Sequence, residues 1–197
     1  MASNELQDVG ISNAPFTMNQ SDYRKSRRKS GNNKHYSSHA VPFDFFKVMP
    51  NKINSAPMAI SNGNKITIIT DYPMKDTKGN SSYVIVGMLQ NRIMENDTVN
   101  LIKSVYPLDD FVDRIIKYAK NRQLVIINKN KAKSILTTMG VQPSEVSRII
   151  SLASNTILNP TENVNPKSEN IPTHNTLNKM TLNTLNSQKS LKRMKQG

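Results

Sequence analysis

The sequence predicts an α+β fold in which a small antiparallel sheet of three or four strands is followed by three or four helices. Residues 57–89 contain three runs rich in β-branched side chains, separated by turn sequences, which is typical of short strands. Residues 108–157 instead repeat apolar side chains at helical spacing. Nearly all valines and isoleucines lie in residues 41–158, a length common for one domain. We therefore expect one folded α+β domain over residues 41–158.

The two ends of the 197-residue chain differ from this domain in composition. Residues 1–40 carry a net charge of +3 and residues 159–197 carry +4, and both segments are polar. Such segments stay disordered because they bury too little apolar surface to offset the entropy of folding. We expect a basic disordered N-terminal arm over residues 1–40 and a disordered polar tail with a basic C-terminus over residues 159–197.

The first elements expected in the domain are an arm and a hairpin. Residues 42–48 hold three of the five phenylalanines, and the prolines on either side predict an extended arm rather than a helix. We expect this arm to pack its rings on the core, and a partner-docking motif is the alternative. The dipeptide Asn62-Gly63 supplies the positive φ values that a tight turn needs. It lies between two β-prone runs, which predicts a hairpin over residues 57–70.

A loop, a strand and a short helix are expected next. Pro and Gly interrupt residues 71–82, which is typical of a loop. Residues 83–89 are apolar and predict a buried strand, in which Gly87 marks a bulge. Asp97 predicts the N-cap of a short helix that ends before Pro107.

The clearest helix signal follows Pro107, which is expected to open a helix. Acidic side chains in its first turn and basic side chains at its end complement the helix dipole: Asp109, Asp110, Lys117, Lys120 and Arg122. Residues 124–127 form a short apolar run, either a fourth strand or a buried connection. Two further helices are expected over residues 130–139 and 143–157, joined around Gly140.

Residue types that carry chemistry are scarce in the domain. The chain has no Cys, and all three histidines lie outside residues 41–158. This excludes thiolate and histidine metal sites, and a Cys nucleophile or His base, from the domain. No phosphate-binding glycine loop, nucleophile elbow or HExxH sequence occurs. We therefore expect no enzyme, no cofactor, no bound metal and no small-molecule substrate.

The sequence also predicts where the protein resides. The first residues are polar and lack the apolar core of a signal peptide. No apolar run approaches the ~18–20 residues of a membrane-spanning helix. We expect a protein that is neither secreted nor transmembrane and that resides in the cytoplasm, the nucleus or a virion.

Two clusters of Lys and Arg in the expected tails predict the partner. Clusters on both sides of a less charged domain favour a polyanion, and phosphate contacts carry no information about base sequence. The predicted nucleic-acid-binding residues are Arg24, Lys25, Arg27, Arg28, Lys29, Lys34, Lys189, Lys192, Arg193 and Lys195. We expect a structural or packaging protein that binds RNA or DNA. Its overall composition resembles that of small viral nucleocapsid or matrix proteins.

One local motif lies in the last two expected helices. The run "ILTTMGVQPSEVSRII" resembles the helix-turn-helix of bacterial and phage repressors, most closely in "GVQPSEVSR". The resemblance implies that Gly140 ends one helix in a left-handed conformation and that the next helix enters the major groove. Residues 132–151 would then form a sequence-specific DNA-binding regulator, with Gln142, Ser144, Ser147 and Arg148 facing DNA. A generic helical hairpin satisfies the same apolar pattern.

A third interpretation is a matrix-like protein on an anionic membrane surface, where each nearby Lys or Arg contributes ~1 kcal/mol. The run "KSRRK" within the first cluster also fits a nuclear import signal, because short basic runs commonly serve either role. The sequence leaves the oligomeric state open, and a homo-oligomer is compatible with it.

Overall fold

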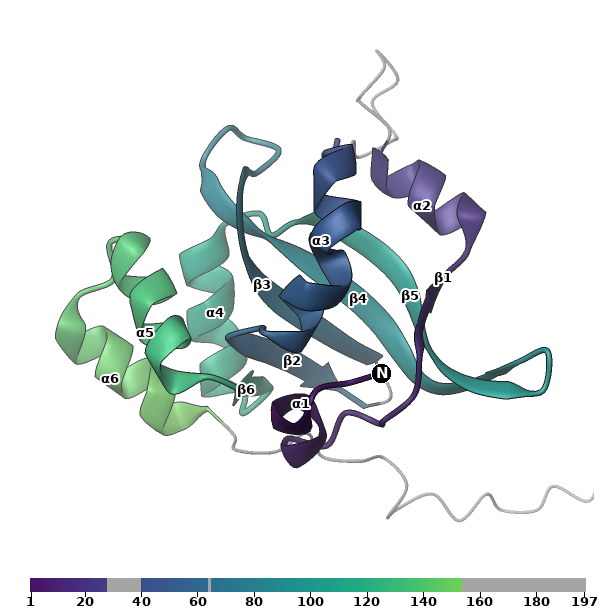
Figure 1. Cartoon of the computed structure of the whole chain (residues 1–197). Helices are drawn as coiled ribbons and strands as arrows, with labels where there is room; N and C mark the ends of the chain where they lie inside the picture. Colours follow the sequence, from purple (N-terminus) through teal and green to yellow (C-terminus); the bar gives the residue numbers. More distant parts are fainter. Residues whose placement is uncertain (28–39, 64, 154–197) are drawn as a thin grey trace, which may run out of the picture. The chain divides into compact units, whose positions relative to one another are not determined.

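The computed structural model describes residues 1–27, 40–63 and 65–153, and in these ranges the chain forms six helices and one six-stranded sheet (Figure 1). The predicted α+β class is confirmed. The sheet is mostly antiparallel and has more strands than the three or four expected. The tail expected over residues 159–197 lies outside the described residues.

Four strands of the sheet form an antiparallel meander: β2 (Met58–Asn62), β3 (Lys65–Lys75), β4 (Ser81–Met94) and β5 (Asp97–Pro107). Strands of three residues form the two edges: β6 (Leu124–Ile126) pairs antiparallel with β2, and β1 (Phe16–Met18) pairs parallel with β5. The strand order is β1-β5-β4-β3-β2-β6. Short edge strands leave few unpaired backbone groups for another chain to pair with.

Helices lie on both faces of the sheet (Figure 1). One apolar core includes α1 (Asn4–Asp8) and α3 (Phe43–Asn54), and the other includes α4 (Phe111–Lys120), α5 (Lys129–Thr138) and α6 (Pro143–Leu152). Because side chains alternate along a strand, Ile68 of β3 lies in the first core and Ile69 lies in the second. The remaining helix, α2 (Gln20–Arg27), lies beside β5.

The structure differs from the expected disordered arm over residues 1–27, which fold onto the domain. Leu6 and Ile11 are 0 % and 2 % exposed and belong to the first core. The buried Asn100 side chain of β5 donates a hydrogen bond of 2.9 Å to the carbonyl oxygen of Ser12. A few apolar side chains suffice here because they complete a core that α3 and the sheet already form. Residues 28–39 of the expected arm lie outside the described residues.

The phenylalanine-rich segment begins helix α3 and is not the extended arm expected from its prolines. Pro42 precedes the first helical residue, where a missing N–H leaves no hydrogen bond unmade. Pro50 lies inside the helix, where it removes a backbone hydrogen bond. Burial of Phe45, which is 0 % exposed, offsets this cost because its ring packs on those of Phe46 and Tyr72.

The short helix expected after Asp97 is also wrong, because this segment is the strand β5. Glu95 and Asn96, with φ of 49° and 77°, form the two-residue turn between β4 and β5. Such a pair of positive φ values is typical of a type I′ hairpin. Asp97 pairs with Met94 directly after this turn. Pairing with β4 and burial of Val99 therefore outweigh the capping tendency of the aspartate.

Other expectations for the sheet are confirmed. Residues 57–70 form the β2–β3 hairpin, residues 83–89 lie within β4, and residues 124–127 contain β6. The register against β5 shifts between Gly87 and Met88, as a bulge requires. A Cβ atom at Gly87 would collide with the Ser104 hydroxyl. The loop expected over residues 71–82 is shorter than that, because β3 continues to Lys75.

The helices of the second half follow the expected order. The helix expected from Pro107 begins at Phe111, because Pro107 ends β5. The last two expected helices are α5 and α6, joined around Gly140. The last helix is shorter than the expected 143–157, because α6 ends at Leu152 and Ala153 has an extended backbone.

Candidate nucleic-acid interface

Three of the predicted nucleic-acid-binding residues lie on one side of α2. Arg24, Lys25 and Arg27 are exposed, whereas Asp22 and Ser26, one turn apart on the same helix, are 3 % and 1 % exposed. The helix therefore directs its short polar side chains toward the protein and its basic ones outward. The other predicted members lie outside the described residues: Arg28, Lys29, Lys34, Lys189, Lys192, Arg193 and Lys195.

Two buried polar side chains hold α2 against β5. A carboxylate oxygen of Asp22 lies 2.7 Å from Lys103 Nζ of β5, and its other oxygen lies 3.7 Å from Lys25 Nζ. The Ser26 hydroxyl accepts a hydrogen bond of 3.2 Å from the Val105 backbone N–H and donates one of 3.0 Å to the Asp22 carbonyl oxygen. These contacts fix the direction in which the basic side of α2 points.

We expect Lys103→Met to destabilise the protein by about 1–3 kcal/mol, because it leaves the buried Asp22 carboxylate without its closest cation. Adding Asp22→Asn should recover much of this loss, since the uncompensated charge is then gone. Urea denaturation of the two single variants and the double variant measures the coupling. Lys47→Met is the matched control, because it breaks an exposed ion pair and should change stability little. Additive effects of the two changes would contradict this role of the pair.

Aromatic side chains lie next to the basic side of α2. We call Tyr23, Arg27, Phe43, Phe46 and Lys47 the α2–α3 cluster. The Arg27 guanidinium carbon lies 5.3 Å from the centroid of the Phe43 ring, and Lys47 Nζ lies 4.9 Å from it. Arg27 also donates a hydrogen bond of 3.2 Å to the Tyr23 hydroxyl. Both cations are within the distance at which an aromatic ring attracts positive charge.

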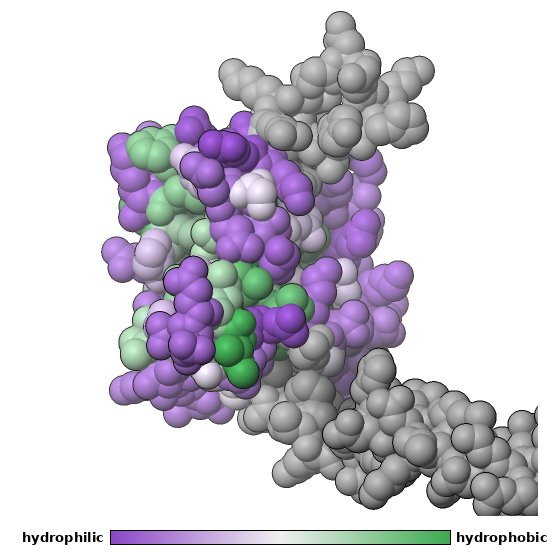
Figure 2. All heavy atoms as spheres, turned by 90° about the vertical axis from the view of Figure 1, so that its right-hand side faces the viewer, coloured by the Kyte–Doolittle hydropathy of each residue, from purple (hydrophilic) through white to green (hydrophobic). Residues whose placement is uncertain are grey.

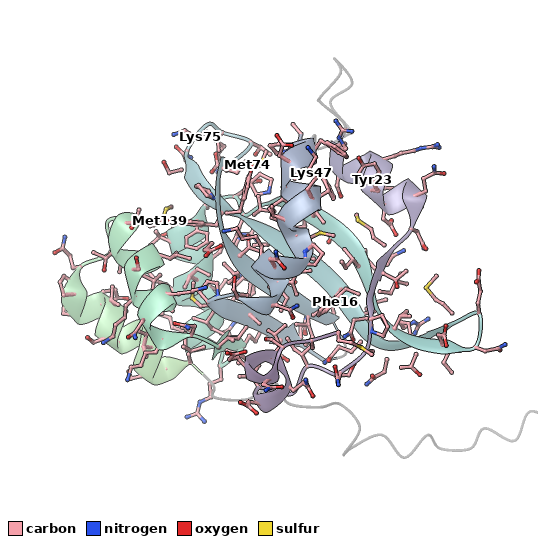
Figure 3. The ribbon with its side chains drawn as sticks, viewed as in Figure 1. Phe16, Tyr23, Lys47, Met74, Lys75 and Met139 are labelled. Carbon is pink, nitrogen blue, oxygen red and sulfur yellow. The ribbon has the colours of Figure 1, made fainter. Side chains whose placement is uncertain are left out.

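Phe46 connects the α2–α3 cluster to the first core, against which its ring packs. The rings of Tyr23 and Phe46 meet edge to face with centroids 4.8 Å apart, which joins α2 to α3. The Val41 backbone N–H donates a hydrogen bond of 3.1 Å to the Ser26 carbonyl oxygen, so the end of α2 and the approach to α3 are held together. Figure 3 shows Tyr23 and Lys47 at the same end of the molecule.

One carboxylate belongs to the surroundings of the cluster. Asp44 Oδ1 lies 2.8 Å from Lys47 Nζ, and this hydrogen bond holds the pKa of Asp44 below its ordinary value. Arg24 and Arg27 form no ion pair within residues 1–27, 40–63 and 65–153. Of the three exposed cations of α2, Lys25 alone pairs with a carboxylate in these ranges, that of Asp22.

Sequence reasoning missed the aromatic half of this surface. The segment with Phe43 and Phe46 is expected to be an extended arm packed on the core, with a partner-docking motif as the alternative. The predicted nucleic-acid-binding residues include neither Tyr23 nor Lys47. The signal that would have found them is the similar mixture of aromatic and basic residues in "YRKSRRK" and "FDFFK". Recognising it required that the second segment be a helix and that the two helices pack together.

The helix-turn-helix candidate forms a well-defined helical hairpin. Gly140 has a φ of 81°. Its N–H donates a hydrogen bond of 2.9 Å to the Thr137 carbonyl oxygen, and the Val141 N–H donates one of 3.0 Å to the Leu136 carbonyl oxygen. This pair of hydrogen bonds is the Schellman motif that ends many helices at a glycine. Val141 is buried and α6 begins at Pro143. The left-handed glycine that the resemblance implied is therefore present.

The four side chains predicted to face DNA are all exposed: Gln142, Ser144, Ser147 and Arg148. However, the Arg148 guanidinium donates hydrogen bonds of 2.8 and 2.7 Å to the Glu145 carboxylate on the same helix. The same hydrogen bonding lowers the pKa of Glu145 and raises that of Arg148, so both stay charged. The Ser147 hydroxyl donates to the Pro143 carbonyl oxygen. This surface thus contains a carboxylate, and an arginine that directs two of its five N–H donors to that carboxylate.

No group of three His, Cys, Asp or Glu side chains in the described part of the chain could hold a metal ion. None of the helices described is long and apolar enough to cross a bilayer.

Comparison of the chain with models of protein families, with curated proteins and with solved structures finds no match. The fold itself defines an α+β protein with helices on both faces of a mostly antiparallel sheet. Its most distinctive surface is the α2–α3 cluster, where exposed cations and aromatic rings meet.

Proposed function

We propose that the protein is a non-enzymatic nucleic-acid-binding protein of the structural or packaging kind, and that its basic segments neutralise phosphates. The observation that carries this proposal is the orientation of α2, which buries Asp22 and Ser26 and presents Arg24, Lys25 and Arg27 outward. The sequence continues this basic run directly after α2. A dense row of cations binds a phosphate backbone by releasing condensed counterions, whatever the base sequence.

The same surface supports this proposal better than it supports the two alternatives. A regulator would read bases with Arg148, but that guanidinium is engaged by Glu145, whose negative charge faces the same solvent. The membrane alternative is not separated by charge, because anionic lipid attracts cations as phosphate backbones do. The aromatic rings separate the two. Arginine next to exposed aromatic rings, as at Arg27 and Phe43, is the combination that single-stranded nucleic-acid channels use. Both alternatives become outcomes of the experiment.

The test replaces Arg24, Lys25, Arg27, Arg28 and Lys29 by Gln. If about four of the five contact phosphates, the plot of log K against log salt should lose a slope of about 3 for single strands, at ~0.7 per contact. Affinity should fall similarly for all base sequences. A salt titration by fluorescence anisotropy with a labelled single strand and a labelled duplex measures both quantities.

The matched control removes the same charge from the second half of the fold and from β3. Lys65, Lys117, Lys120, Lys129 and Lys133 are all exposed, and their replacement by Gln should leave the slope close to that of the unchanged protein. An unchanged slope in the first variant would refute binding through α2, and a flattened slope in the control would place it on the α4–α6 side. Binding to phosphatidylserine vesicles without nucleic-acid binding would favour the matrix-like protein. A sequence preference lost in Arg148→Ala would favour the regulator.

A further inference from the structure

The exposed ring of Phe43 is unusual in this structure. Among the aromatic side chains that the structure describes, Phe43 alone is exposed, at 48 %. The next two aromatic residues of α3, Phe45 and Phe46, pack in or against the first core. A single exposed apolar side chain is ordinary, and Ile93 is more exposed at 79 %. What distinguishes Phe43 is that two cations lie beside its exposed ring.

The Phe43 ring is held in place on a rigid support. It belongs to the first turn of a 12-residue helix whose Phe45 ring is fully buried two residues later. The neighbouring Phe46 ring packs edge to face on Tyr23 of α2. The backbone under Phe43 is therefore fixed by the core, so that binding through the ring would require little ordering of the protein.

Two cations complete the surroundings of the ring. Arg27 and Lys47 lie 5.3 and 4.9 Å from the ring centroid and come from different helices. A base stacked on Phe43 would have its backbone phosphates within reach of these side chains. Stacking of a base on an aromatic ring is stronger than an exposed cation–π contact, so a base can replace a cation at the ring while that cation turns to a phosphate.

We propose, on the basis of the nucleic-acid binding proposed above, that the α2–α3 cluster binds single-stranded nucleic acid by stacking an unpaired base on Phe43. Arg27 and Lys47 then hold the adjoining phosphates. In a duplex the faces of the bases are already stacked on one another, so the ring finds no partner there. Every base has such a face, and the site is therefore tolerant of base sequence.

The first test compares Phe43→Leu with the unchanged protein on a labelled oligothymidylate and on a duplex of equal length. We expect Phe43→Leu to lose about 5- to 150-fold in affinity for the single strand, the usual value of one stacked base. Duplex affinity and the salt slope should stay the same, because no charge changes. Phe43→Tyr should retain binding, since it keeps the aromatic face. Val48→Ala, which trims another exposed apolar side chain of α3, is the matched control and should bind normally.

The second test uses the absence of tryptophan from the chain. Phe43→Trp introduces one tryptophan into a protein that has none but has six tyrosines. Excited at wavelengths that tyrosine does not absorb, this tryptophan should lose emission as oligothymidylate is added and a base stacks on it. Emission unchanged at saturating oligothymidylate would show that no base stacks there.

The outcomes separate this inference from the proposed function. If Phe43→Leu binds the single strand normally while the five-Gln variant loses its salt slope, phosphate binding stands and base stacking is wrong. Equal losses on single strand and duplex would also overturn stacking. If the unchanged protein binds neither polymer, the proposed function fails and the inference fails with it. A loss of vesicle binding in Phe43→Leu, without nucleic-acid binding, would assign the ring to a membrane surface.

Discussion

Leu6→Ala should lower the free energy of unfolding by about 2–5 kcal/mol, the range measured for removing a fully buried leucine side chain. Leu6 is 0 % exposed and belongs to the core that α3 and the sheet share. The large value is expected although Leu6 lies in a segment whose composition predicts disorder. A disordered arm would tolerate the same change without loss, so the experiment separates the two descriptions of residues 1–27.

Urea denaturation followed by circular dichroism measures this difference. Glu5→Ala, at the adjacent exposed position of α1, is the matched control and should leave the unfolding midpoint nearly unchanged. The slope of the transition should stay the same in both variants, because each still unfolds as one unit. If Leu6→Ala unfolds at the midpoint of the unchanged protein, α1 does not contribute to the core.

Local sequence patterns predicted those elements that local forces determine. Asn62-Gly63 led to the β2–β3 hairpin, and Gly63 has the expected positive φ, at 62°. Asn62 does not share it, because Asn62 ends β2 and pairs with Lys65. Gly87 led to a bulge that the register shows. Helical spacing of apolar residues led to α4, α5 and α6. The turn and the helices follow from near neighbours in the sequence, whereas the bulge was found because glycine is the residue that permits the close approach of Ser104 from β5.

The expectations that failed concern segments whose structure depends on distant residues. β1 is held by parallel pairing with β5, more than eighty positions further along the chain, with Phe16 opposite Asn100. Asp97 begins a strand because β4 supplies a partner for it. Such pairing is invisible to propensity and capping rules, which consider only neighbouring residues. Composition likewise did not predict that residues 1–27 fold, because a segment needs only a few apolar side chains to complete a core that other elements already form.

Only part of the candidate interface was predicted, because the rest depends on contacts between residues that are distant in the sequence. The charge run alone selected Arg24, Lys25 and Arg27, and the structure places all three outward on α2. Phe43 is not distinguished from Phe45 and Phe46 by residue type, because its exposure follows from the packing of its neighbours in the fold. The contact between the basic side of α2 and the first turn of α3 is a tertiary feature.

Phe45→Ala should destabilise the protein by about 3–5 kcal/mol, the range for removing a buried phenylalanine ring. Phe45 is fully buried, and its ring meets Phe46 and Tyr72 with centroids 5.9 and 5.0 Å apart. The change leaves a cavity between α3 and the sheet that this helix cannot fill without moving. It also removes the packing that offsets Pro50 within the helix.

Phe43→Ala, two residues earlier on the same helix, is the matched control for this prediction. Its ring is 48 % exposed and contacts mainly Arg27 and Lys47, so we expect a loss of about 1 kcal/mol or less. Thermal and urea denaturation of both variants should therefore give a large shift for Phe45→Ala and a small one for Phe43→Ala. Single-strand affinity should show the reverse order when each variant is measured well below its unfolding temperature. A loss below about 1 kcal/mol for Phe45→Ala would mean that α3 does not pack on the sheet through this ring, and Phe43 would then lack the rigid support that base stacking requires.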